Sequence, residues 1–224
     1  MNVLLLGPLW RNEPIKRFLE EHGNTVVAYN DEINTELVEQ HAIDIILSSG
    51  YGPIIKEPIV SRYHNKIYNL HATYLPYGKG IGTTFFSVFE GSPTGVSIHY
   101  IDAYIDTGDI LFRRAVEYTT DDTLRTFYHT LLAETEKLFI EHWNEIADRD
   151  YTPMQQETLG IEVPSAAAWI RSVLWICCQL SGILPLMKSR RWVLISCWGR
   201  ISGIGMMRKF LEAATSCPSS AAEF

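Results

Sequence analysis

The chain has 224 residues, of which 46% are hydrophobic and 20% charged, and its formal net charge at pH 7 is -7. This length suits one α/β domain with an appendage, and the composition is that of a globular protein, which excludes a disordered chain. The acidic balance offers no basic patch to a phosphate backbone, so we expect no nucleic-acid partner.

The two ends of the chain bear on its location and on metal binding. Residues 1–7 have no positive charge before their short apolar run and no small-residue cleavage site after it, which predicts a buried first strand and a cytoplasmic protein. All four cysteines (Cys177, Cys178, Cys197 and Cys217) lie in the last third. Their spacing matches neither a zinc pattern nor a disulfide framework, so we expect no metal site.

From residue 3 the chain alternates short aliphatic runs with amphipathic segments. This alternation predicts an α/β fold: a Rossmann-like, mostly parallel sheet with helices on both faces. The runs expected as buried strands are Val3 to Leu6, Thr25 to Ala28, Asp44 to Leu47 and Lys66 to Leu70. The segments expected as helices between them are Glu13 to His22 and Glu32 to His41.

A different pattern follows Leu70. Residues 74–82 are too rich in glycine and proline for a helix or strand interior and predict a shaped loop. The elements expected after it are a helix from Thr84 to Phe89, strands from Thr94 to Ile101 and from Asp109 to Arg114, and a long helix capped by residues 121–123 that runs to about Ile146.

The segment from about Glu157 differs in kind. It carries four of the six tryptophans, and its seven basic and four acidic residues reverse the earlier charge balance. Its apolar runs keep neither the helix nor the strand period, so the tail has no assigned fold; translation of a shifted reading frame would give the same scrambling. The run from Ala168 to Met187 has the length of a membrane span, but Arg171 and Pro185 interrupt it, and we expect no membrane partner.

Asn69 and His71 end a predicted strand, and the carboxyl ends of parallel strands are where α/β sheets place ligands. Because side chains alternate along a strand, both project to the same side, whereas Leu70 points the other way. The amide can donate to a developing oxyanion, and a neutral imidazole can take a proton or polarise a carbonyl. Taken alone, such a pair is also consistent with local hydrogen bonding.

Asp106, Thr107 and Gly108 predict a tight turn between two strands. An aspartate there is either a turn former or a carboxylate directed into a cleft. His99, one strand earlier, is expected to be structural and not a second base.

In order and spacing, these elements resemble the folate-dependent formyltransferase family over residues 1 to about 150. The segment from His71 to Pro76 is similar to the family's His-x-x-x-Leu-Pro signature. The resemblance implies a catalytic triad of Asn69, His71 and Asp106, a catalytic domain at residues 1–150, and an atypical C-terminal segment at residues 151–224. It also implies N10-formyltetrahydrofolate as the formyl donor, with no metal.

The resemblance further implies two sets of binding residues. Those expected at the folate are Gly50, Tyr51, Gly52, Pro53, Ile54, Ile101 and Asp102. Those expected at the acceptor are Trp10, Tyr74, Lys79 and Phe85, although a solvated lysine and packed aromatic side chains are the ordinary alternatives.

Within the family, the sequence is most similar to sugar N-formyltransferases acting on nucleotide-linked amino sugars, such as dTDP-4-amino-4,6-dideoxyglucose. Such enzymes continue into a segment that makes a homodimer contact, and the unassigned tail leaves that contact in doubt. The alternatives are a truncated, catalytically impaired protein that still binds folate or nucleotide, an enzyme like methionyl-tRNA formyltransferase, and a hydrolase of formyltetrahydrofolate.

Overall fold

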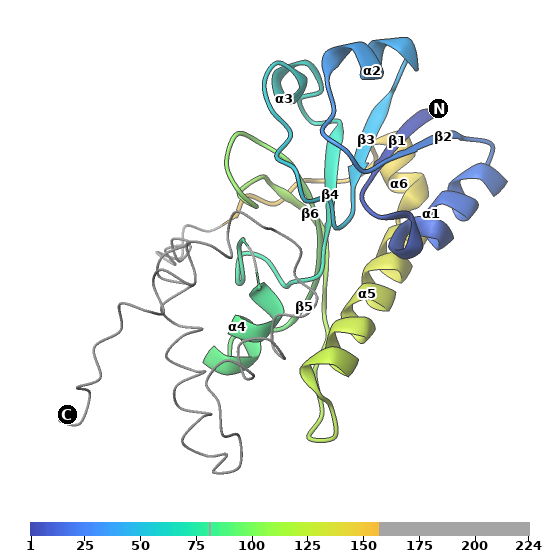
Figure 1. Ribbon diagram of the computed structural model, residues 1–224. Coiled ribbons are helices and arrows are strands. Elements are labelled where there is room, and N and C mark those ends of the chain that lie inside the picture. The colour runs from blue at the N-terminus through green and yellow to red at the C-terminus, as the bar shows by residue number, and fades with distance from the viewer. Residues whose placement is uncertain (81, 157–224) are drawn as a thin grey trace, which may run out of the picture. The chain divides into compact units, whose positions relative to one another are not determined.

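The computed structural model describes residues 1–80 and 82–156. Within them one sheet has the strand order β2-β1-β3-β4-β5-β6 (Figure 1). In chain order the strands are β1 Asn2–Leu6, β2 Thr25–Tyr29, β3 Ile45–Ser48, β4 Ile67–His71, β5 Gly95–Tyr100 and β6 Ile110–Ala115. Strands β2, β1, β3 and β4 are parallel, whereas β5 pairs antiparallel with both β4 and β6. The predicted mostly parallel sheet is therefore confirmed.

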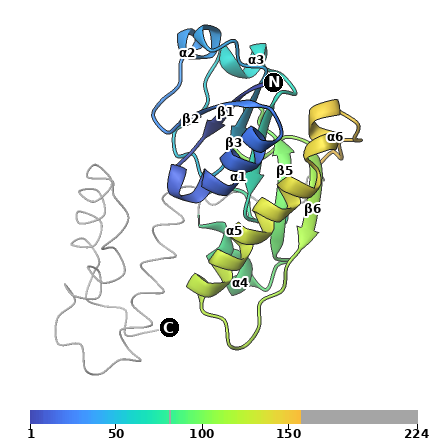
Figure 2. The same ribbon diagram turned by 90° about the vertical axis from the view of Figure 1, so that its right-hand side faces the viewer.

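Helices cover both faces of the sheet, as predicted (Figures 1 and 2). They are α1 Leu9–Glu21, α2 Thr35–Gln40, α3 Ile59–Arg62, α4 Thr83–Glu90, α5 Leu124–Glu141 and α6 Trp143–Asp148. The alternation along β1 separates the two cores: Val3 and Leu5 pack with residues of α1, α5 and α6, whereas Leu4 and Leu6 pack with α2 and α3.

Several predicted helix limits were wrong. Helix α1 begins at Leu9, before the expected Glu13, and continues through Pro14 because Ile15 and Leu19 are buried against the sheet. The helix expected from Glu32 is limited to α2, which begins after Asn34, whose side chain accepts a hydrogen bond from the Leu37 N–H at 2.8 Å.

The long helix expected to reach Ile146 is divided in two. Helix α5 ends at Glu141, and His142 separates it from α6. The His142 ring stacks on Phe112 of β6 with centroids 3.9 Å apart, and Trp143 is buried. Packing against the sheet therefore sets the break, which the helical period of the sequence does not reveal. Helix α3 was missed because four residues are too few to show a period.

Residues 151–156 continue along the sheet. The backbones of Ile110 and Met154 exchange two hydrogen bonds of 2.8 Å, and the Gln156 amide donates to the carbonyls of Asp106 and Gly108 at 3.0 and 2.6 Å. The predicted boundary after residue 150 stays a prediction. The rest of the predicted tail, from residue 157, lies outside the described residues. Among the residues that the structure describes, no helix is long and apolar enough to cross a membrane.

Helix α5 should supply much of the stability of this unit, because it buries Phe127, Leu131 and Leu138 against the sheet. Leu131 is 1% exposed, so we expect Leu131→Ala to lower the free energy of unfolding by about 2–5 kcal/mol. Leu124→Ala, on the same helix but 46% exposed, is the matched control and should change it by less than about 1 kcal/mol. Chemical denaturation measures both; equal losses would contradict this assignment of the core.

Candidate active site

The carboxyl end of β4 forms the floor of the candidate site. Asn69 and His71 are partly exposed on one side of the strand, whereas Leu70 is 1% exposed and packs in the core. Both polar side chains line a pocket of about 1240 Å³. The predicted alternation of this strand is therefore confirmed.

Asp106 reaches the same point from the connection between β5 and β6. Its backbone has φ +53°, a left-handed conformation that aspartate tolerates better than most residues. The turn also needs glycine at 108, because a Cβ there would lie 2.1 Å from the Tyr100 carbonyl oxygen. The constrained turn directs the Asp106 carboxylate inward, where Oδ2 accepts a hydrogen bond from the Gly80 N–H at 2.9 Å.

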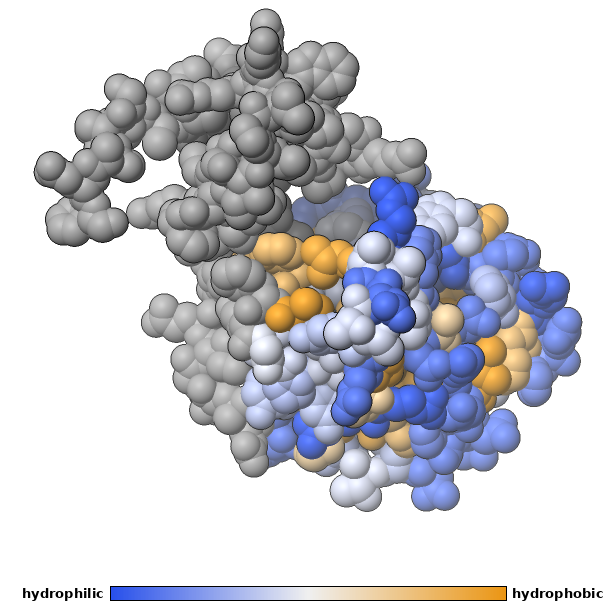
Figure 3. Space-filling view, turned by 90° about the horizontal axis from the view of Figure 1, so that it is seen from below, coloured by the Kyte–Doolittle hydropathy of each residue, from blue (hydrophilic) through white to orange (hydrophobic). Residues whose placement is uncertain are grey.

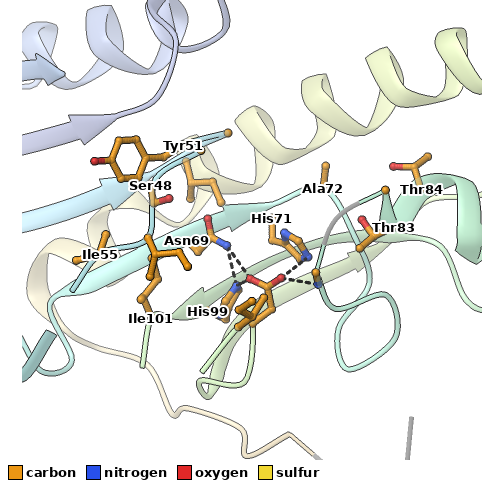
Figure 4. A pocket seen from close by; sticks show the side chains of 18 of the residues that line it. Ser48, Tyr51, Ile55, Asn69, His71, Ala72, Thr83, Thr84, His99 and Ile101 are labelled. Atoms are coloured by element: carbon orange, nitrogen blue, oxygen red, sulfur yellow. Dashed lines mark hydrogen bonds and ion pairs between the residues drawn. The ribbon is translucent and has the colours of Figure 1, made fainter. Parts of the chain in front are cut away.

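The other two predicted catalytic side chains, Asn69 and His71, labelled in Figure 4, both approach this carboxylate. Asn69 Nδ2 donates to Asp106 Oδ1 at 3.2 Å, and His71 Nε2 lies 3.5 Å from Asp106 Oδ2. The side chains of His71 and Asp106 are 15% and 13% exposed, so they are shielded but accessible from the pocket. The arrangement places an amide donor, an imidazole and a carboxylate around one small volume.

A fourth side chain, His99 of β5, completes the cluster. It is 1% exposed, and burial lowers its pKa to about 4, so the ring is neutral at pH 7. Nδ1 lies 2.7 Å from the Tyr100 carbonyl oxygen and must donate to it, which leaves Nε2 to accept from Asn69 Nδ2 at 3.1 Å. Two acceptors, His99 Nε2 and Asp106 Oδ1, thus fix which end of the Asn69 amide faces the carboxylate.

This position refines the expectation for His99. A buried imidazole with a low pKa is poorly suited to act as a second base, yet it contacts the cluster directly. The structural feature that brings His99 to the cluster is its position opposite Asn69 in the antiparallel pairing of β5 with β4. Because this pairing depends on how distant strands come together, it could not be predicted from the spacing of residues in the sequence.

All seven residues predicted at the folate line the pocket: Gly50, Tyr51, Gly52, Pro53, Ile54, Ile101 and Asp102. Of the residues predicted at the acceptor, Phe85 lines it too. Trp10, Tyr74 and Lys79 are not among its lining residues. Trp10 is 74% exposed, and the Arg113 guanidinium carbon lies 4.8 Å from the centre of the Tyr74 ring. The roles of these three residues stay predictions.

The lining suits a flat, partly apolar ligand such as a pterin. Tyr51 and Ile55 come from the segment after β3, Ile101 from just after β5, and Thr83 and Thr84 from the start of α4 (Figure 4). Ile54 and Tyr104 are 71% and 76% exposed at the pocket, an unusual exposure for large apolar side chains that a bound ring would reduce. The described residues on the face seen in Figure 3 are mostly hydrophilic, with apolar patches among them.

One group within the described chain has the composition of a metal site. The ligand atoms of His71, His99 and Asp106 lie within 4.8 Å of one another. In this arrangement, however, the lone pair of His99 Nε2 accepts the hydrogen bond from Asn69. The expected absence of a metal stays a prediction.

Comparison with known proteins identifies the family. Residues 8–142 match the model of the formyl transferase family, and the chain belongs to this family. The resemblance inferred from the sequence is thereby confirmed.

Individual solved formyltransferases are similar to this chain. The formyltransferase PseJ from Anoxybacillus kamchatkensis, solved with UDP-4,6-dideoxy-4-formamido-L-AltNAc and tetrahydrofolate, is 39% identical, with a TM-score of 0.66 over 70% of this chain and 82% of that one. The N-formyltransferase from Helicobacter canadensis, solved with folinic acid and dTDP-3-aminofucose, shares the fold at 20% identity, with a TM-score of 0.57 over 72% and 69% of the two chains.

A curated relative is also similar. Methionyl-tRNA formyltransferase from Agathobacter rectalis is 29% identical over 157 residues, which are 67% of this chain. The match spans 51% of that protein, so the chain covers about half the length of this relative.

Proposed function

We propose that this protein transfers a formyl group from N10-formyltetrahydrofolate to the amine of a nucleotide-linked amino sugar. The observation that carries the proposal is the convergence of Asn69, His71 and Asp106 on one point of a pocket large enough for two ligands. Pockets for drug-sized ligands occupy about 300–1,000 Å³, and the volume of this one, about 1240 Å³, exceeds that range.

A sugar acceptor is favoured over tRNA by two observations. The 39% identity to PseJ, which was solved with a UDP-linked formamido sugar, exceeds the 29% identity to the methionyl-tRNA formyltransferase. A tRNA partner also calls for a basic surface, whereas this chain carries a net charge of -7. The acceptors to try first are the dTDP-4-amino-4,6-dideoxyglucose expected from the sequence and a UDP-linked 4-amino sugar.

The reaction requires a neutral amine and a stabilised oxyanion. The amine nitrogen bonds to the formyl carbon, the bond from that carbon to N10 breaks, and the proton shed by the amine ends on N10. Asp106 is the group placed to receive that proton, directly or through a water, while its carboxylate orients His71. The imidazole then faces the negative charge that develops on the formyl oxygen.

Asn69 contributes through its two N–H groups. Without substrate, one points to His99 Nε2 and the other to Asp106 Oδ1. Binding of the formyl oxygen requires the second N–H to turn away from Asp106. Protonation of Asp106 weakens its oxygen as an acceptor, so uptake of the amine proton and release of the Asn69 N–H favour one another.

The test is to incubate the protein with N10-formyltetrahydrofolate and each candidate sugar nucleotide, and to detect by mass spectrometry a product heavier by one formyl group. We expect Asn69→Ala to lower the rate about 100- to 1000-fold, because it removes the oxyanion donor. Asn24→Ala, an amide outside the pocket, is the control and should keep the rate. Formate release without an amine would instead indicate a hydrolase, and folate binding without turnover an impaired protein.

A further inference from the structure

Two arginines line the pocket from a side that the triad does not use. Arg11 lies in the first turn of α1, and Arg125 lies in the first turn of α5. Tyr128, one turn after Arg125, lines the pocket as well, and its hydroxyl lies 3.4 Å from Arg11 Nη1. Gly50 leaves room for this guanidinium, since a Cβ at that position would lie 2.5 Å from Arg11 Nη1.

Within the described part of the chain, neither guanidinium has a carboxylate partner. Among the described residues, no carboxylate lies within 4.0 Å of Arg11 or Arg125, although Arg62 and Arg114 both form such pairs. Arg11 is also half-buried, and desolvation lowers its pKa, although an arginine stays charged at neutral pH. For Arg11, a partly buried cation without a carboxylate is costly, and an anionic ligand would provide the missing partner. Arg125 is exposed, so its guanidinium is accessible to the same ligand from solvent.

The start of α1 has the polarity of an anion site, and its third residue, Arg11, lines the pocket. This helix has 13 residues, and Pro8 at its N-cap makes no side-chain hydrogen bond to the first turn. The leading N–H groups of a helix have no intrahelical partner and, with the helix dipole, favour phosphate-like anions. Helix α5, in contrast, begins with a complete capping box at Thr123, so Arg125 is the donor there.

Charge is therefore separated across the pocket. Its acidic lining residues, Asp102 and Asp106, both come from the connection between β5 and β6, and its basic lining residues come from the two helices. A nucleotide-linked amino sugar has the matching polarity, with an amine on the sugar and a diphosphate next to it.

We propose that Arg11 and Arg125 bind the diphosphate of the acceptor and so place its amine at Asp106. The inference rests on the proposed function, because it names the subsite that would recognise the nucleotide. Guanidinium groups match phosphate oxygens through paired N–H donors. The glutamate carboxylates of folate are the other anion with this chemistry; the uncapped start of α1 favours phosphate, because helix N-termini are recurrent phosphate sites.

The experiment measures binding of UDP, dTDP, uridine and tetrahydrofolate by calorimetry to the full chain and to three variants. Arg11→Gln and Arg125→Gln should each raise the Kd for the better of the two diphosphates about 10-fold and leave tetrahydrofolate binding unchanged, because a hydrogen bond to a charged group contributes about 1.5–3 kcal/mol. Arg17→Gln is the matched control: it removes the same charge from α1, but Arg17 does not line the pocket.

Each outcome decides the proposal. The proposal is supported if both pocket variants bind the diphosphate more weakly, bind uridine as the unaltered chain does, and the Arg17→Gln control binds every probe normally. Weaker tetrahydrofolate binding with unchanged diphosphate binding overturns it and assigns the arginines to the folate tail. Unchanged binding of every probe, or no diphosphate binding by the unaltered chain, also overturns it. Because no turnover is measured, arginine-dependent binding in a protein that transfers no formyl group would reject the proposed function and keep this subsite.

Discussion

Replacing Asp106 by asparagine should reduce kcat for formyl transfer about 100- to 10,000-fold, the range typical of losing a positioned acid or base. The carboxylate accepts from two donors at once, the Gly80 N–H and Asn69 Nδ2. An asparagine has one acceptor oxygen and one NH₂ group, so one of these donors must lose its acceptor. The variant also cannot take up the amine proton, so the effect should fall on kcat more than on KM.

Asp109→Asn is the control for this prediction. It makes the same charge change three residues later in the same connection, but Asp109 does not line the pocket. Steady-state kinetics on both variants, with thermal unfolding to verify the fold, provides the comparison. Equal losses in the two variants would mean that the effect comes from removing a negative charge from this loop and not from a specific role of Asp106. Retention of activity by Asp106→Asn would remove Asp106 from the mechanism.

The parts of this fold that the sequence predicts are those governed by local patterns. The aliphatic runs that become β1, β3 and β4 are largely buried, so their composition is sufficient to locate them. The run from Thr25 to Ala28 was also expected to be a buried strand, but β2 is an edge strand of the sheet and is only partly buried. Asn69 and His71 were found for the same reason, because the end of a buried strand and the alternation of its side chains are both local properties. Asp106 needed the family resemblance, since a turn aspartate is ordinary without it.

The features that sequence reasoning missed depend on contacts between distant segments. Arg11 and Arg125 are 114 positions apart in the chain, and they share a pocket because α1 and α5 pack on the same face of the sheet. His99 reaches Asn69 through an antiparallel register that no spacing rule gives. Arg11, in the first turn of α1, lines the pocket, whereas the neighbouring Trp10, expected at the acceptor from its place after the first strand, does not; its role stays a prediction.

His99 should act as a positioning residue for Asn69. In His99→Leu the acceptor at Nε2 is lost, the Asn69 amide is free to turn, and kcat should fall about 10- to 100-fold with little change in KM, a smaller loss than removing the oxyanion donor itself. In His99→Gln the amide oxygen can again accept from Asn69, so part of the activity should return. A purely structural role predicts equal losses in both variants.

The pH dependence of stability gives an independent readout of the same residue. The pKa of His99 falls from 6.5 to about 4 on folding, chiefly through burial, with His71 adding repulsion and Asp106 opposing the shift. The unfolded chain therefore binds a proton below pH 6.5 that the folded chain refuses until about pH 4, and stability present above pH 6.5 is lost as the pH falls through that window. The loss can approach about 1.4 kcal/mol per pH unit. Denaturant unfolding between pH 4 and 7 should show a shallower slope in both His99→Gln and His99→Leu than in the unaltered chain. An unchanged slope would mean that His99 is not the neutral acceptor that orients Asn69.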